Sequence, residues 1–233
     1  MLSVRGLNAF YGRAHTLFDV ALEVGRGEVV VLLGRNGAGK STTLKSIIGL
    51  VAPVSGDIVF AGRPIRGLAP FAISRLGIGY VPEERRIFQK LTVMENLEVG
   101  RQPQRAGAPF WTLDKLFALF PNLDEMRHRP GGMMSGGEQQ MLTIARTLMG
   151  NPLLLLLDEP SEGLAPVIVA QMAEAIAAVK AEGLTVLLCE QNLRFATRVS
   201  DRTYILEKGQ VRFHGTLAEL QHNAEVRHQY LTA

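Results

Sequence analysis

A glycine-rich segment at residues 34–42 limits what this 233-residue chain can fold into more than any other feature. It reads Gly34-Arg35-Asn36-Gly37-Ala38-Gly39-Lys40-Ser41-Thr42 and matches the pattern G-x-x-x-x-G-K-[ST]. The apolar run Val29–Leu33 precedes it directly, and a helix-like segment from Ser41 to Leu50 follows it. This order of buried strand, glycine-rich turn and helix predicts a phosphate-binding loop at the edge of a parallel α/β sheet.

The residue types in this loop explain the prediction. Glycines let backbone N–H groups turn inward around phosphate oxygens, and the N-terminus of the following helix adds the positive end of its dipole. We expect Lys40 to place a positive charge on the β- and γ-phosphates and the Ser41 hydroxyl to bind Mg²⁺. The alternative is a chance glycine-rich turn, which gives no packing reason for the Lys-Ser pair.

A second motif follows the five leucines Leu153–Leu157, which predict a central strand. Asp158 and Glu159 come directly after them, at the carboxyl end of the strand, where open α/β sheets bind ligands. We expect Asp158 to hold Mg²⁺ through its water shell and Glu159 to polarise the water that attacks the γ-phosphate. An Asp-Glu pair alone is more often a plain helix start, but the phosphate loop favours the catalytic interpretation.

A third motif, Met134–Gln140, opens an amphipathic helix. Ser135 and Glu138 have the spacing of a capping box, which by itself is a sufficient structural explanation. It does not explain Gly136 and Gly137 in the first turn, because each costs about 1 kcal/mol relative to alanine in a helix. Two bare glycines beside a serine hydroxyl predict a helix N-terminus that an anion can approach closely.

These three motifs together resemble the nucleotide-binding subunits of ABC transporters, and the resemblance covers essentially the whole chain. It implies that ATP binds the phosphate loop and that Tyr11 stacks on adenine. It also implies that Ser135, Gly136, Gly137 and Glu138 contact ATP held by a facing subunit, so that two subunits enclose two nucleotides head to tail.

The expected fold is an α/β P-loop NTPase with a RecA-like parallel sheet, an inserted helical subdomain and an N-terminal antiparallel β portion. Strands and helices are expected to alternate up to about residue 83, helices alone from about 84 to 150, and strands and helices again after that. We therefore predict one domain over residues 1–233, with a nucleotide-binding core at 1–83 and 151–233. The helical subdomain takes residues 84–150, and by the resemblance it receives a helix of a membrane subunit.

Two residues depart from the commonest family pattern. Glu83 replaces a glutamine at the junction of core and helical subdomain, and we expect its carboxylate still to reach Mg²⁺ or a metal-bound water. Gln191 replaces a histidine after the last core strand, where it can donate a hydrogen bond to the γ-phosphate but carries no charge. The catalytic residues expected are therefore Glu159, Lys40 and Gln191, with slower hydrolysis at this chain's own loop.

The same departures resemble one subgroup closely. Residues 81–86, residues 158–166 and the Glu190-Gln191-Asn192 triplet are similar to one of the two unlike ATPases, the F type, of bacterial branched-chain amino acid importers. The resemblance leaves other cargoes open, such as urea, short amides or an exported lipid. A non-transport ABC ATPase is a further alternative. By the resemblance, such proteins usually have two tandem ATPase domains or long coiled-coil insertions, whereas this sequence has a single phosphate loop and no heptad run. An ATP-binding switch without turnover is disfavoured by Glu159.

The net charge, the length of the apolar runs and the single cysteine limit the kinds of partner and location that we expect for this chain. The net charge of +3, from 25 basic and 22 acidic residues, is too small to predict nucleic-acid binding. The longest apolar runs fall short of the roughly 20 residues that span a bilayer, and the lone Cys189 forms no internal disulfide. By the resemblance, we expect a peripheral protein on the cytoplasmic face of the cell membrane. Its expected partners are permease subunits, a second ABC ATPase that is either a copy or an unlike chain, and indirectly an extracytoplasmic substrate-binding protein.

Overall fold

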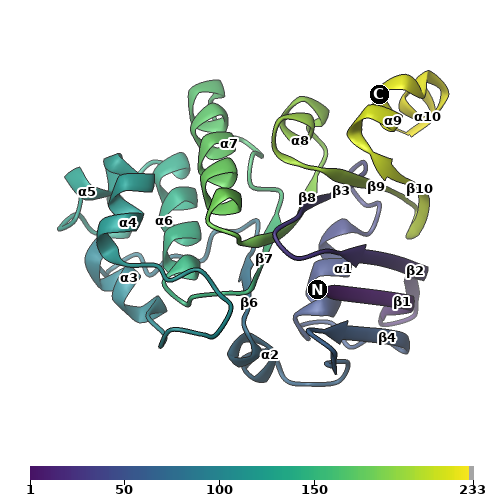
Figure 1. Cartoon of the computed structure of the whole chain (residues 1–233), viewed down its shortest axis with the longest axis horizontal. Helices are drawn as coiled ribbons and strands as arrows, with labels where there is room; N and C mark the ends of the chain where they lie inside the picture. The colour runs from purple at the N-terminus through teal and green to yellow at the C-terminus, as the bar shows by residue number, and fades with distance from the viewer. Residues whose placement is uncertain (231–233) are drawn as a thin grey trace.

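A six-stranded sheet lies at the centre of the computed structural model, which describes residues 1–230 (Figure 1). Its order is β10-β9-β3-β8-β7-β6, and all neighbouring strands are parallel except β10, which is antiparallel to β9. The strands are β3 (Val29–Leu33), β6 (Ile78–Val81), β7 (Leu154–Asp158), β8 (Thr185–Glu190), β9 (Arg202–Glu207) and β10 (Gln210–Thr216). Every residue of β3, β7 and β8 is buried, which explains their unbroken apolar runs.

An antiparallel sheet from the N-terminal part lies beside the central sheet, as the resemblance implies (Figure 1). Its order is β2-β1-β4-β5, with β1 (Leu2–Tyr11), β2 (Ala14–Val24), β4 (Ser55–Phe60) and β5 (Arg63–Pro64). Helix α1 (Lys40–Ile47) shares one apolar cluster with both sheets. The phosphate loop is therefore held between the two sheets at the start of this helix.

The remaining helices flank the central sheet or extend from it. Helices α3 to α6 gather at one end of the molecule, and α9 and α10 lie at the other (Figure 1). Their bounds are α2 (Pro70–Leu76), α3 (Val93–Gly100), α4 (Leu113–Leu119), α5 (Pro121–Glu125), α6 (Gly136–Leu148), α7 (Pro166–Ala181), α8 (Leu193–Val199), α9 (Leu217–His222) and α10 (Ala224–Tyr230), with the 3₁₀ turn η1 at Gly131–Met133. Along the chain, α3 to α6 lie between β6 and β7, while the division at residues 84 and 150 stays a prediction.

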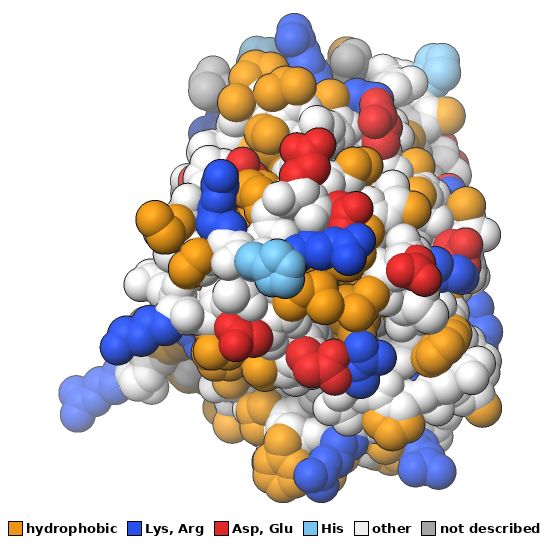
Figure 2. Space-filling model, turned by 90° about the vertical axis from the view of Figure 1, so that its left-hand side faces the viewer, with side chains coloured by type: hydrophobic (Ala, Val, Ile, Leu, Met, Phe, Trp, Pro, Cys, Tyr) orange, Lys and Arg blue, Asp and Glu red, His pale blue; other side chains and the backbone are white. Residues whose placement is uncertain are grey.

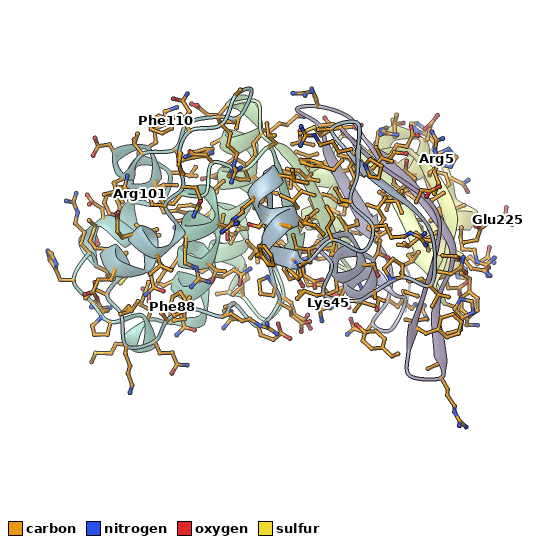
Figure 3. All side chains as sticks on the ribbon, turned by 90° about the horizontal axis from the view of Figure 1, so that it is seen from below. Arg5, Lys45, Phe88, Arg101, Phe110 and Glu225 are labelled. Carbon is orange, nitrogen blue, oxygen red and sulfur yellow. The ribbon has the colours of Figure 1, made fainter. Side chains whose placement is uncertain are left out.

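The end formed by the helical elements presents basic and acidic side chains interspersed with apolar ones (Figure 2). Seen from below, Phe88, Arg101 and Phe110 lie on this helical side, and Arg5 and Glu225 lie on the opposite side (Figure 3). One apolar cluster connects the helical elements to the central sheet, because Met141 and Leu148 of α6 share it with Leu155 of β7. Within the described residues, the helices are too short or too polar to cross a membrane.

Two predicted elements differ from the structure at their ends. Helix α1 stops at Ile47 rather than Leu50, because Gly49 adopts the left-handed φ of 79. A side chain at position 49 would lie 2.6 Å from the Leu68 carbonyl oxygen, which favours glycine there. Strand β7 begins and ends one residue later than the leucine run. Asp158 is therefore part of the strand.

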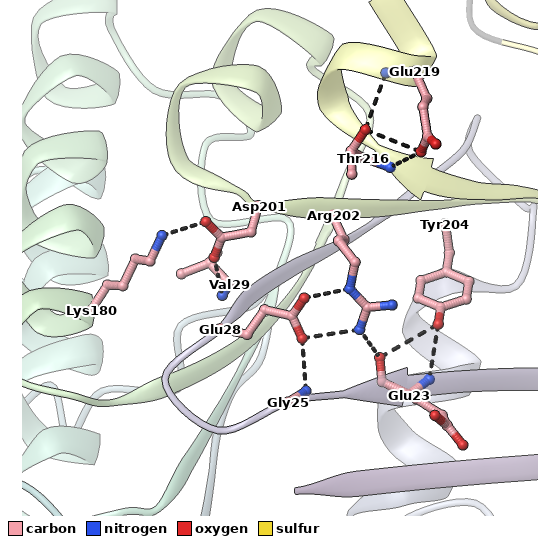
Figure 4. A network of polar contacts seen from close by, with 10 residues as sticks. All are labelled: Glu23, Gly25, Glu28, Val29, Lys180, Asp201, Arg202, Tyr204, Thr216 and Glu219. Carbon is pink, nitrogen blue, oxygen red and sulfur yellow. Dashed lines mark hydrogen bonds and ion pairs between the residues drawn. The ribbon is translucent and has the colours of Figure 1, made fainter.

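A polar network fastens the sheet at the end opposite the phosphate loop (Figure 4). Glu28, just before β3, accepts hydrogen bonds from the Arg202 guanidinium and, at 2.7 Å, from the Gly25 N–H. The Arg202 guanidinium holds the pKa of Glu28 below its usual range. Asp201 accepts from the Val29 N–H at 2.9 Å. These contacts fix where β3 begins.

Candidate nucleotide site

The carboxyl ends of three adjacent strands meet at one edge of the central sheet. In the parallel ladders, Leu33 of β3 pairs with Glu190 of β8, and Cys189 of β8 pairs with Asp158 of β7. The Gly34 N–H donates to the Glu190 carbonyl oxygen at 3.2 Å. Open α/β sheets bind ligands at this kind of edge. The phosphate loop, the Asp-Glu pair and Gln191 therefore emerge side by side.

Close approaches explain two of the loop's glycines. A side chain on Gly34 would lie 2.4 Å from the Leu206 carbonyl oxygen. Gly39 adopts φ 106, and a side chain there would lie 2.7 Å from Leu17. Arg35, Asn36 and Gly37 are exposed at the loop tip, whereas Ala38, Gly39, Lys40 and Thr42 are buried and Ser41 is half-buried. The loop thus keeps an open backbone at its tip above a buried lysine.

Lys40 is buried and fully engaged. Its Nζ donates to the Gly34 carbonyl oxygen at 2.8 Å and to the Arg35 carbonyl oxygen at 3.1 Å. It also forms an ion pair with Glu159 Oε1 at 3.0 Å, with only 3% and 6% of the two side chains exposed. The expected phosphate-binding lysine therefore lies against the expected catalytic carboxylate. To reach a phosphate group, Lys40 must exchange these oxygens for those of the ligand.

Asp158 receives two hydroxyl hydrogen bonds. Ser41 Oγ donates to Oδ1 at 2.8 Å, and the Tyr80 hydroxyl donates to Oδ2 at 3.0 Å. Burial raises the pKa of Asp158, and the two hydroxyl bonds oppose that rise. Burial and the adjacent Asp158 charge raise the pKa of Tyr80 well above its usual range. Tyr80 was not among the predicted site residues, because its contact with Asp158 depends on the pairing of β6 with β7.

Three further carboxylates gather near Lys40. Glu159 adopts the left-handed φ of 46. Its buried Oε2 has no hydrogen-bond partner within the described residues. Glu162 faces it, and the hydrogen bond between the two carboxyls, together with burial, raises the pKa of Glu162 to about 7. Glu83 is exposed, yet burial and the charges of Glu159 and Asp158 raise its pKa. This concentration of negative charge favours a cation.

The donor chemistry fits Mg²⁺ when a nucleotide supplies part of the coordination. Ser41, Asp158 and Glu83 offer oxygen atoms, which Mg²⁺ prefers, and Mg²⁺ keeps several waters in nucleotide sites. No three His, Cys, Asp or Glu residues form a metal-binding group within residues 1–230. The protein therefore offers a partial ligand set of the kind found in sites completed by phosphate oxygens and water.

Gln191 is exposed directly after β8, and its N–H donates to Glu190 Oε2 at 3.2 Å. Glu190 itself is buried and also accepts from the Ser161 N–H at 3.1 Å. Glu190 was not among the predicted site residues. An acidic residue ending the otherwise apolar and neutral segment Thr185–Cys189 was the signal that could have identified it.

The Ser-Gly-Gly motif opens α6. Ser135 is exposed and its capping box with Glu138 is confirmed, with the Glu138 N–H donating to Ser135 Oγ at 3.4 Å and the Ser135 N–H to Glu138 Oε2 at 2.7 Å. A side chain on Gly136 would lie 2.7 Å from the Arg85 guanidinium, and one on Gly137 would lie 2.9 Å from Ile168. The two glycines therefore let Arg85 and Ile168 pack directly against the first turn of α6, while Ser135 before it stays exposed.

Comparison with known proteins agrees with this geometry. A family model described as "ABC transporter" matches residues 17–162, which is more than half of the chain. The chain belongs to the ABC transporter family. The high-affinity branched-chain amino acid transport ATP-binding protein BraG of Pseudomonas aeruginosa is 47% identical over 99% of both chains. The lipopolysaccharide export system ATP-binding protein LptB of Escherichia coli is 35% identical over 99% of this chain and 96% of its own.

A solved ATP-binding subunit of an ABC transporter superposes with a TM-score of 0.82 at 32% identity, covering 98% of this chain and 92% of that one. The predicted ABC ATPase architecture is thereby confirmed. The protein is an ATPase subunit whose hydrolysis of ATP is coupled to transport.

In this ABC ATPase, the described hydrogen bonds and ion pair of Lys40, Ser41 and Asp158 involve neither Tyr11 nor the Ser-Gly-Gly motif. Tyr11 ends β1 just before Gly12, with 49% of its surface exposed. The Ser-Gly-Gly motif lies at the start of α6 and packs against Arg85 and Ile168. The roles expected of these residues stay predictions.

Proposed function

We propose that this ABC ATPase drives uptake of branched-chain or other hydrophobic amino acids. Its much higher identity with BraG than with LptB supports this cargo over an exported lipid. Urea or amide uptake is an alternative that needs the same ATPase chemistry. A non-transport ABC ATPase is not supported by the relatives, whose names describe transport and export systems.

In the proposed working unit, two ABC ATPase chains face each other head to tail, and each is either a copy of this chain or an unlike ATPase. Ser135 and the N–H groups of Gly136 and Gly137 would bind the γ-phosphate held by the facing phosphate loop, with Glu138 fixing the helix start. The exposed Ser135 at the start of α6 supports this role, because the N–H groups and the dipole of a helix N-terminus attract anions.

Hydrolysis in this proposal depends on positioning and on charge stabilisation. Lys40 exchanges the Gly34 and Arg35 carbonyl oxygens for phosphate oxygens, and this movement releases Glu159 from its ion pair. The freed carboxylate then accepts a proton from the water that attacks the γ-phosphorus. The left-handed backbone of Glu159 holds its side chain at the end of β7 for this role.

Ser41, Asp158 and Glu83 would hold Mg²⁺ together with the nucleotide. The ion supplies charge neutralisation for the phosphate oxygens when it is bound. Tyr80 orients Asp158 through its hydroxyl hydrogen bond. Gln191 would donate a hydrogen bond to the γ-phosphate, and its lack of charge predicts a slower site than one with histidine.

A groove of about 500 Å³ between the sheet and the helical elements supports the proposed contact with a permease. Exposed apolar side chains line it, among them Phe71, Phe88 and Val99. The Arg146 guanidinium lies over the Phe88 ring, 5.1 Å from the ring centre. Arg146 Nη1 is buried and lacks a hydrogen-bond acceptor within the described residues. An amphipathic helix of a membrane subunit fits this groove, with movement passing through the helical subdomain at 84–150.

The proposal places the protein at the cytoplasmic face of the cell membrane, with an extracytoplasmic binding protein acting through the permeases. A pull-down from detergent-solubilised membranes of the native host tests it. We expect two permeases and a second phosphate-loop ATPase, and ATP-dependent leucine uptake after reconstitution with them. Ribosomal or DNA-repair proteins would refute transport, while urea or lipid cargo would refute only the amino acid assignment.

A further inference from the structure

Glu190 is a buried carboxylate to which the proposed reaction gives no role. It ends β8 with 1% of its surface exposed, between the carboxyl ends of β3 and β7. Burying a carboxylate costs free energy, and a fold retains one where hydrogen bonds or a partner charge offset that cost. Its position beside the phosphate loop calls for a reason other than packing, because an apolar residue would fill the same space.

The hydrogen bonds of Glu190 join separate loops of the nucleotide site. Oε1 accepts from the Ser161 N–H at 3.1 Å, and Oε2 accepts from the N–H groups of Gln191 and Asn192, both at 3.2 Å. Its backbone carbonyl oxygen accepts from the Gly34 N–H at 3.2 Å. One residue thus holds the loop after Glu159, the loop that carries Gln191 and the first residue of the phosphate loop.

The chemistry of these partners requires an acceptor at both side-chain oxygens. Three of the side-chain contacts come from backbone N–H groups and a fourth comes from the Ser161 hydroxyl, and an ionised carboxylate can accept from all of them because it has about four lone-pair sites. A glutamine is nearly the same size, but its NH₂ group would face either the Ser161 N–H or the N–H groups of Gln191 and Asn192. The structure therefore predicts that one of the two loops moves when Glu190 becomes an amide.

We propose that Glu190 is a positioning residue that couples the Ser161 loop to Gln191. The Ser161 loop directly follows the proposed catalytic carboxylate Glu159 along the chain. Movement of this loop would then shift Gln191 relative to the γ-phosphate. The inference rests on the proposed role of Gln191 and adds a residue that sets the position of Gln191 relative to the loop after Glu159.

A double-mutant cycle of Glu190→Gln and Gln191→Ala in steady-state ATPase assays of the purified chain tests the coupling. Glu190→Gln should lower kcat by about tenfold to a hundredfold, as expected for a misplaced reacting group, while KM for ATP changes less than about twofold. In the Gln191→Ala background, the same change should lower kcat by less than about twofold, because residues that act through one another are non-additive.

Glu28→Gln is the matched control. Glu28 also accepts a backbone N–H, and it lies at the opposite end of β3 from the nucleotide site. This variant should lower the melting temperature and leave kcat unchanged. Independent, multiplicative effects of Glu190→Gln and Gln191→Ala would overturn the coupling and leave the role of Gln191 intact. A loss of stability in Glu190→Gln without a loss of kcat would overturn it too. A wild-type kcat in Gln191→Ala alone would refute the role of Gln191 and, with it, this inference.

Discussion

The buried pair between Lys40 and Glu159 leads to a stability prediction in which a second substitution repairs the first. Lys40→Ala removes the ion pair to Glu159 Oε1, and the buried Oε2 has no hydrogen-bond partner within the described residues. Breaking a buried ion pair from one side costs about 3–5 kcal/mol. We therefore expect Lys40→Ala to lower the free energy of unfolding by that amount in the absence of nucleotide.

Glu159→Gln should cost far less. The amide oxygen still accepts a hydrogen bond from Lys40, and the Gly34 and Arg35 carbonyl oxygens still accept two more, so we expect a loss of about 1 kcal/mol. With Glu159 already neutral, Lys40→Ala removes hydrogen bonds but leaves no buried charge. The double variant should then be more stable than Lys40→Ala alone, with a coupling energy of about 2–3 kcal/mol.

Urea unfolding of the four proteins without nucleotide at pH 7.5 measures this coupling. For a chain of this size, each kcal/mol should also appear as a shift of about 2–4 °C in the melting temperature. The control pair is Lys115 and Glu182, whose side chains are each 45% exposed, so its double-mutant cycle should give a coupling below about 1 kcal/mol. Additive losses for Lys40→Ala and Glu159→Gln would refute the reasoning.

Three further predictions follow from the same site. Tyr80→Phe should lower stability by about 1–2 kcal/mol, because it removes the hydrogen bond to Asp158. In the wild type this bond lowers the pKa of Asp158, so its loss should raise that pKa and move the acid limb of the ATPase pH profile to higher pH. Gly136→Ala should raise the stability of the free chain by up to about 1 kcal/mol, since only a flexible guanidinium must move, whereas Gly137→Ala should lower it by a similar amount; both should weaken ATP-driven dimerisation in light scattering. Glu162→Gln should flatten the pH dependence of stability in urea unfolding between pH 5 and pH 8: the wild-type carboxyl, with a pKa raised from 4.5 to about 7, favours the folded state at low pH and loses that contribution as the pH rises through about 7. An unchanged pH profile, unchanged dimerisation or an unchanged slope would contradict the respective prediction.

The sheet and the phosphate loop could be predicted from the sequence because their signals are local. Strands buried on both faces read as apolar runs, as in Val29–Leu33, and the glycine-rich turn follows at once along the chain. The capping box at Ser135 was equally local, since all its partners lie within three residues.

The contacts inside the site could not be predicted in this way. The ion pair between Lys40 and Glu159 and the hydrogen bond between Tyr80 and Asp158 join residues far apart in sequence, and they depend on the strand order of the sheet. Glu190 was missed for the same reason, because its role depends on which loops flank β8. The register that moves Asp158 into β7 also depends on pairing with β8.

The central claim is that the Ser-Gly-Gly motif completes the ATP site of a facing subunit, and mixing two inactive variants tests it most directly. Lys40→Ala disables the phosphate loop, and Ser135→Arg disables the motif. In a head-to-tail dimer, one of the two sites of each mixed pair is intact, so an equimolar mixture should recover about a quarter of the wild-type ATPase rate. No recovery on mixing, with each variant able to dimerise, would show that motif and loop act within one chain and would contradict the account.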